Sequence, residues 1–76
     1  MAHWINEEVN INFKPVKFIQ DIIANLEEYD KEGNWSYINE ADALDHYTKE
    51  CVIEDIMTTD QRNKLIEKYC DYYDKF

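Results

Sequence analysis

The sequence predicts a mainly α fold, a small three-helix domain, on three observations. Apolar residues recur at helical spacing over most of the chain, and the only glycine and the only proline both fall at predicted helix ends. The third observation is length. A chain of 76 residues buries only about 60% of the surface that its unfolded form exposes, so the core must be modest. We therefore expect residues 1–76 to form a single domain.

The first thirteen residues are expected to be extended or to form a short strand. Val9, Ile11 and Phe13 alternate with two asparagines, and this period of two is typical of a half-buried strand. A second short alternation follows later in the chain, so residues 8–13 could pair with residues 35–38 in a hairpin. Two strands alone are marginal in water, so this pair would need a helix packed on it.

Residues 14–32 are expected to form the first helix. Pro15 is tolerated in a first helical turn, where its missing N–H is not needed, and Asn12 or Lys14 would be the cap. Gly33 is expected to end the helix in the left-handed conformation. The apolar positions fall on two adjacent stripes, Val16, Ile19, Ile23 and Leu26, and Phe18, Ile22 and Tyr29, which predicts a wide buried face.

The second and third helices are expected over residues 39–57 and 58–75, the former either continuous or broken. Asn39 is the expected N-cap of the second helix. Thr58 followed three positions later by Gln61 is the pattern of a capping box at the start of the third. The apolar face of the third helix is expected to contain Leu65, Ile66, Tyr69, Tyr73 and Phe76.

The two cysteines, Cys51 and Cys70, both fall on apolar stripes of predicted helices. We expect two reduced, buried thiols, because disulfide frameworks of small secreted domains normally use four or more cysteines. A disulfide or a ligand role is the alternative. The N-terminal residues lack the pattern of a signal peptide, and no apolar run is long enough for a membrane span. A cytoplasmic location without membrane contact is therefore expected.

The negative charge is concentrated in the first two thirds of the chain. Residues 1–35 hold seven acids and three bases, residues 36–57 hold six acids and one base, and residues 58–76 hold four of each, for a net charge of −9. Direct nucleic-acid binding is not expected, because contacts to phosphates need clustered Lys and Arg and the chain has one arginine. The acidity predicts instead a field directed at a basic protein.

The candidate partner-binding residues are two groups of acids and the aromatic residues beside them. Acids at the end of the first helix oppose its dipole, so a sequence shaped for stability alone would not place them there. Trp and Tyr are common anchors of protein interfaces. A solvated acidic face that only keeps the protein in solution is the alternative. The candidates are Glu27, Glu28, Asp30, Glu32, Trp35, Tyr37, Glu40, Asp42, Asp45, Tyr47, Glu50, Glu54 and Asp55.

No pattern of residues predicts catalysis or a cofactor. Asp42, His46 and Glu50 repeat at four-residue spacing and could offer metal ligands, but no second motif completes a first coordination shell. With one glycine, the chain has no material for a phosphate-binding loop. Paired carboxylates act as acid and base only in a dry cleft, which 76 residues rarely enclose. We therefore expect no enzyme activity, no metal and no cofactor.

The combined expectation is an inhibitor that masks a basic surface of a nucleic-acid-binding protein by imitating nucleic acid. Small acidic inhibitors of restriction or CRISPR enzymes, from phages and other mobile elements, share this size and charge, which is a similarity of composition. An immunity protein or antitoxin that neutralises a basic toxin is the first alternative. A helical regulator or homodimer without an inhibitory role is the second.

Overall fold

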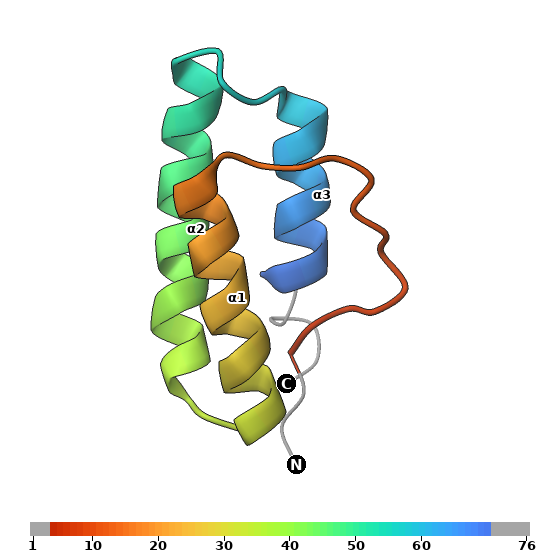
Figure 1. Cartoon of the computed structure of the whole chain (residues 1–76), viewed down its shortest axis with the longest axis vertical. Coiled ribbons are helices and arrows are strands. Elements are labelled where there is room, and N and C mark those ends of the chain that lie inside the picture. Colours follow the sequence, from red (N-terminus) through yellow and green to blue (C-terminus); the bar gives the residue numbers. More distant parts are fainter. Residues whose placement is uncertain (1–3, 71–76) are drawn as a thin grey trace.

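The computed structural model of the chain describes residues 4–70, and the mainly α, three-helix prediction is confirmed (Figure 1). The helices are α1 (Lys17–Glu32), α2 (Ser36–Ile53) and α3 (Thr59–Tyr69). The expected last turn of the third helix, with Tyr73 and Phe76 on its apolar face, lies outside the described residues.

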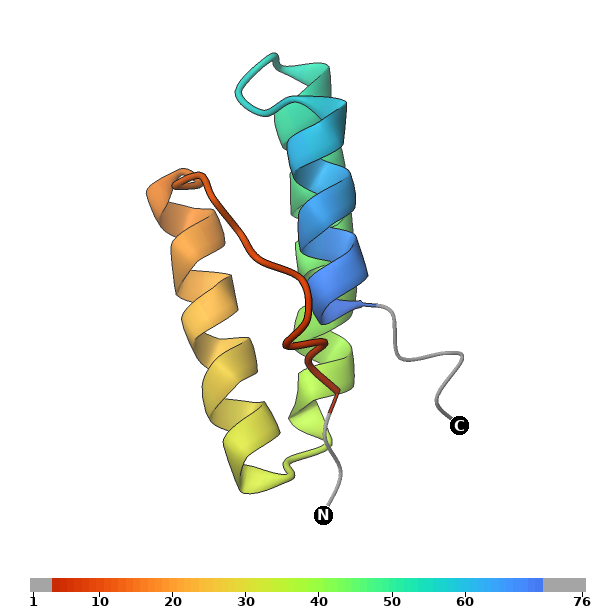
Figure 2. The ribbon, with the colours of Figure 1, turned by 90° about the vertical axis from the view of Figure 1, so that its right-hand side faces the viewer.

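Helix α2 is the centre of the fold. Helices α1 and α3 each pack along it, and residues 4–16 run along the open side between α1 and α3 (Figure 2). We call residues 4–16 the N-terminal strap. The strap closes the core on the side that α2 leaves uncovered, so four segments rather than three enclose the apolar interior.

The expected hairpin between residues 8–13 and 35–38 is wrong. Residues 36–38 are the first turn of α2, and no strand occurs between residues 4 and 70. The alternation in the strap was nevertheless a correct guide to its two sides. Val9 is buried and Ile11 is partly buried, whereas both asparagines between Val9 and Phe13 are exposed. A period of two marks an extended segment with one side inward, and it does not require a partner strand.

Hydrogen bonds attach the strap to both flanking helices. Two bonds go to Asp30 in α1. The backbone N–H of Trp4 donates to the Asp30 carboxylate at 2.5 Å, and the N–H of Ile5 donates to the same oxygen at 3.4 Å. Other bonds go to Lys68 in α3, where the N–H of Asn6 donates to the Lys68 carbonyl at 2.8 Å. The Lys68 ammonium in turn donates to the carbonyl of Val9 at 2.7 Å. These bonds satisfy strap groups that a sheet would otherwise pair.

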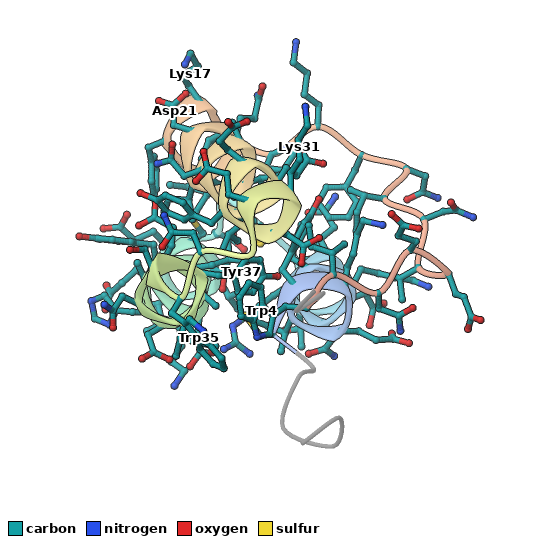
Figure 3. All side chains as sticks on the ribbon, turned by 90° about the horizontal axis from the view of Figure 1, so that it is seen from below. Trp4, Lys17, Asp21, Lys31, Trp35 and Tyr37 are labelled. Carbon is teal, nitrogen blue, oxygen red and sulfur yellow. The ribbon has the colours of Figure 1, made fainter. Side chains whose placement is uncertain are left out.

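The aromatic centre of the core is contributed by the strap and by α2. The rings of Trp4 and Tyr37, both fully buried, stack on each other in the space between the helices (Figure 3). The Tyr37 hydroxyl donates to the carbonyl of Tyr69 at 2.6 Å, which ties α2 to the end of α3. Ile19, Leu26 and Leu65 complete the interior from the other elements, and each is fully buried.

Helix α1 begins later than residue 14, the position expected from Pro15. Its N-cap is Val16, whose extended backbone (φ −61°, ψ 158°) keeps Pro15 outside the first turn, and neither Asn12 nor Lys14 caps it. The predicted end is confirmed. Gly33 takes φ 67° and ψ 30°, and the N–H of Asn34 reaches back to the Tyr29 carbonyl at 2.8 Å. This is the Schellman arrangement, in which glycine carries the left-handed residue without steric cost.

Helix α2 runs unbroken from Ser36 to Ile53, three residues ahead of its predicted start. Its N-cap is Trp35 rather than Asn39, and the side chain of Asn34, one residue earlier, accepts the N–H of Ser36 at 2.9 Å. At the other end Asp55 has φ 65°, and the N–H of Ile56 bonds the Cys51 carbonyl at 2.8 Å. The helix therefore ends before residue 57 in a left-handed turn that uses aspartate where glycine is usual.

The capping box predicted for α3 is confirmed. The hydroxyl of Thr58 accepts the N–H of Gln61, and the Gln61 side chain accepts the N–H of Thr58, both at 3.1 Å. Two of the backbone donors that a helix start leaves without partners are satisfied in this way.

Both cysteines are free thiols in the structure. Cys51 is buried, and Cys70 is partly buried with its sulfur 3.5 Å from the carbonyl of Ala41. Burial, with a smaller effect from nearby carboxylates, raises the pKa of the Cys70 thiol to about 12. Within residues 4–70, none of the helices combines the length and the apolar character needed to cross a membrane.

Candidate protein-binding face

The structure separates the thirteen candidate residues by exposure. Two are partly buried, Glu40 and Asp45, and two are buried, Asp30 and Tyr37. The remaining nine are exposed, namely Glu27, Glu28, Glu32, Trp35, Asp42, Tyr47, Glu50, Glu54 and Asp55. A partner that docks on the folded protein can therefore reach most of the candidates, and the buried pair requires a correction.

Asp30 and Tyr37 belong to the interior and cannot line an exposed binding surface. Asp30 is 5% exposed and holds the strap through the N–H groups of Trp4 and Ile5, whereas Tyr37 is 0% exposed within the aromatic core. The sequence-based interpretation treated Asp30 as one acid among several at the end of a helix. It could not show that a distant segment returns to use this carboxylate.

Asp45 has a structural partner of its own. Its carboxylate forms an ion pair with Arg62 of α3, the only arginine in the chain, and the Arg62 side chain is largely covered. This ion pair links α2 to α3. It engages both groups within the fold, so the charge that Asp45 offers to an external partner is partly neutralised.

Two contacts join α1 to α2 at the surface. The Asn25 carboxamide donates to the carboxylate of Glu40 at 2.7 Å, and the rings of Phe18 and Tyr47 meet edge to face at a centroid distance of 6.0 Å. Phe18 and Asn25 are seven residues apart in α1, and Glu40 and Tyr47 are seven residues apart in α2. Positions seven apart share one side of a helix, so the two pairs mark one continuous outer seam.

Acidic residues follow this seam on both helices. Positions three or seven residues beyond a seam residue lie on the same side of the helix, which adds one alanine and five more acids. We call the resulting set the outer α1/α2 face. It comprises Phe18, Asp21, Asn25, Glu28 and Glu32 of α1, and Glu40, Ala43, Tyr47 and Glu50 of α2 with Glu54 just beyond it. Six of these ten positions are acids and none is a base.

Two further contacts lie at the outer α1/α2 face, an ion pair and a ring contact. Lys17 forms an ion pair with Asp21, and both side chains lie on the outside of α1 (Figure 3). The ring of His46 contacts Tyr47 at a centroid distance of 5.3 Å. Five face acids remain apart from the Lys17 pair, spread along the whole length of the seam.

Some exposed candidates lie on other sides of the molecule. The charge of Glu27 acts on α3, where it contributes, after the larger effect of burial, to raising the pKa of Tyr69 to about 12. Trp35 is 65% exposed and meets the edge of Trp4 at 5.3 Å, at the end of the molecule where α1 and α2 are joined. Asp55 lies in the turn after α2. The candidates therefore do not form one continuous surface.

Phe18 is a site residue that the sequence-based interpretation missed. Its apolar stripe predicted burial, but the side chain is 46% exposed, the same fraction as its neighbour Tyr47. Helical periodicity predicts which side of a helix faces the core. It does not predict how much of that side the neighbouring element covers. Position 18 lies at the start of α1 and at its border with solvent, where α2 covers only one side of the ring.

The spacing of Asp42, His46 and Glu50 does not produce a metal centre. In the described part of the chain, no three His, Cys, Asp or Glu side chains come close enough together to hold a metal ion. These three residues lie along an exposed side of α2.

Comparison with known proteins gives no relative from which a role could be transferred. The chain matches no protein-family model, and neither the curated proteins nor the solved structures include one that is significantly similar.

Proposed function

We propose that this protein is a non-catalytic inhibitor that binds a basic surface of a nucleic-acid-binding protein and keeps nucleic acid away from it. One observation carries the proposal: six acids and two half-exposed aromatic rings share the outer α1/α2 face, and only one of these acids, Asp21, is paired with a base, Lys17 at the edge of the face. A row of carboxylates along helices presents negative charge at regular intervals, as a phosphate backbone does.

The charge of the whole chain supports a basic partner. At −9 over 76 residues, the field attracts positive surfaces and raises association rates by roughly 10 to 1,000-fold at low salt. Nucleic acid itself would be repelled. The one arginine is committed to Asp45, and Lys68 donates to strap carbonyls, so neither side chain is free to contact phosphates.

The position of several acids also supports a role other than stability. Asp55 holds a left-handed conformation that glycine adopts at lower cost, and it lies at a helix C-terminus, where the dipole disfavours negative charge. Glu32 lies in the last turn of α1 and is disfavoured for the same reason. Residues that each cost a few tenths of a kcal/mol are expected where binding selects the charge.

A pair of matched variants tests the proposal. The face variant is Glu28→Gln with Glu50→Gln and Glu54→Gln, all exposed on or beside α1 and α2. The control variant is Glu8→Gln with Asp60→Asn and Glu67→Gln, which removes the same charge from exposed positions on the strap and α3. Wild type and both variants would be immobilised and exposed to host lysate, and the captured proteins identified by mass spectrometry.

The expected result is a nucleic-acid-binding protein captured by wild type and control but lost with the face variant, and released by excess DNA or RNA. A captured protein that nucleic acid never displaces would contradict the mimic. A toxin whose growth inhibition the protein relieves would establish the immunity alternative in its place. Equal capture by the face and control variants would show that the face is not the binding surface.

A further inference from the structure

The aromatic pair at the centre of the outer α1/α2 face is the least explained part of it. Phe18 and Tyr47 are both 46% exposed, with ring planes at 82°. A solubilising acidic surface has no use for two exposed rings, which promote association. Their edge-to-face contact favours one orientation of the two rings relative to each other.

Carboxylates lie beside both rings. Glu50 is three residues after Tyr47, a spacing that places side chains about 5 to 6 Å apart at Cβ on a helix. Asp21 is at the same spacing after Phe18, but its carboxylate is paired with Lys17. Glu54 follows one turn further along the same side as Tyr47. An aromatic ring next to a carboxylate is a combination that one side chain matches well. The planar guanidinium of arginine stacks on a ring and donates to a carboxylate from its edge.

A second copy of this chain is a poor match for the same place. Two molecules with a net charge of −9 would bring their face acids together, and like charges in contact across an interface repel each other. Lysine is a weaker match than arginine, because its ammonium is strongly hydrated and has no planar face to lay on a ring. Charge complementarity therefore selects a basic segment, and the rings select arginine within it.

We infer that Phe18 and Tyr47 form an arginine-binding site on which an arginine of the basic partner stacks while Glu50 and its neighbours bind the guanidinium edge. The inference rests on the proposed function and adds to it the identity of the contact residue. The carboxylates of the face take the place of the nucleic-acid phosphate that the partner's arginine would otherwise contact.

The test uses two fluorescein-labelled peptides of one amphipathic sequence, with arginine at every basic position in the first and lysine in the second. Binding to the whole protein would be measured by fluorescence anisotropy. The arginine peptide is expected to bind about fivefold more tightly than the lysine peptide. The double variant Phe18→Leu with Tyr47→Leu keeps apolar side chains and removes both rings, so this preference should disappear.

Controls separate this inference from the proposed function. Ile53→Leu changes an apolar side chain that is 73% exposed and should leave the preference intact, and thermal unfolding would establish that every variant is folded. Equal affinity for the two peptides, or a preference that survives the double variant, overturns the arginine site. If the three-glutamate face variant still weakens both peptides in that case, the proposed function stands. A dimer in sedimentation equilibrium that the double variant dissociates would assign the rings to self-association and overturn the site as well.

Discussion

The indole of Trp4 stacks on the phenol ring of Tyr37 with a centroid distance of 4.9 Å and an interplanar angle of 15°. This contact joins the first described residue of the strap to the first turn of α2, and both side chains are fully buried. The indole N–H of Trp4 has no hydrogen-bond partner among the described residues. The Trp4 ring therefore contributes by packing, and the backbone of the strap contributes the hydrogen bonds to Asp30 and Lys68.

Removing the indole ring of Trp4 should strongly destabilise the fold. Trp4→Ala is expected to lower the free energy of unfolding by about 3 to 5 kcal/mol, because it leaves a cavity beside Tyr37. Trp4→Phe should cost less, since phenylalanine keeps an aromatic ring and buries no N–H. Urea unfolding followed by circular dichroism would measure both. Trp35→Ala is the matched control, expected to cost under about 1 kcal/mol because Trp35 is 65% exposed. A similar loss at both tryptophans would contradict this account of the core.

Asp30 is expected to contribute to stability, in contrast to the exposed acids near it. Asp30→Asn should cost about 1 to 3 kcal/mol, because the charge-assisted bonds to the N–H groups of Trp4 and Ile5 weaken inside the fold. Glu28→Gln removes one charge from an exposed position of the same helix and should change stability by less than about 0.5 kcal/mol. Denaturant unfolding of the two variants makes the comparison, and equal effects would show that the strap does not depend on Asp30.

Asp55 should be a site where the protein can be stabilised. Asp55→Gly is expected to raise the free energy of unfolding by about 0.5 to 1 kcal/mol, because glycine adopts φ near 65° without strain and carries no charge against the helix dipole. Asp55→Ala should have the opposite sign, since alanine tolerates left-handed backbone less well than aspartate. Thermal unfolding of the pair is sufficient. A loss of stability with glycine would be incompatible with the turn described.

Alkaline pH should destabilise the fold through Cys70. The pKa of its thiol is raised from 9.0 to about 12, chiefly by burial, so the folded form retains a proton that the unfolded form releases. Stability from this group is then fully present below pH 9 and is lost as the pH rises toward about 12. Tyr69, raised from 10.0 to about 12, adds to the loss in the upper part of this range.

Cys70→Ala separates the two contributions. The variant should lose stability less steeply than wild type between pH 9 and 10, where the thiol titrates only in the unfolded form. Urea midpoints at intervals across this range would give the two slopes. Identical slopes would show that the Cys70 thiol is not protected by the fold, and rapid labelling of native wild type by a thiol reagent near neutral pH would lead to the same conclusion.

The parts of the fold that the sequence could predict are those determined locally. The Thr58 capping box and the Gly33 helix end follow from short-range chemistry, and both are confirmed. The predicted start of α2 at Asn39 was three residues too late, because the side chain of Asn34 accepts the Ser36 N–H and the helix begins there.

Contacts between residues far apart in the chain could not be predicted from the sequence. The sequence predicts that the first thirteen residues are extended or form a short strand, because a period of two does not indicate whether hydrogen bonds go to a sheet or, as here, to Asp30 and Lys68. The same limit applies to the candidate site. Segment charge located the acids in the first two thirds of the chain, but burial of Asp30 and exposure of Phe18 depend on which elements cover them. Exposure is a tertiary property that periodicity alone cannot supply.

The salt dependence of binding to the captured partner tests the central claim most directly. Association rate and affinity would be measured between about 50 and 300 mM salt for wild type, for the Glu28, Glu50 and Glu54 face variant, and for the control at Glu8, Asp60 and Glu67. We predict a steep loss of wild-type affinity with salt, much of it in the association rate, and binding by the face variant that is about tenfold weaker and less sensitive to salt. The control should follow wild type closely. Affinity that does not respond to salt, or a control variant that loses as much as the face variant, would contradict the claim that the outer α1/α2 face binds a basic protein.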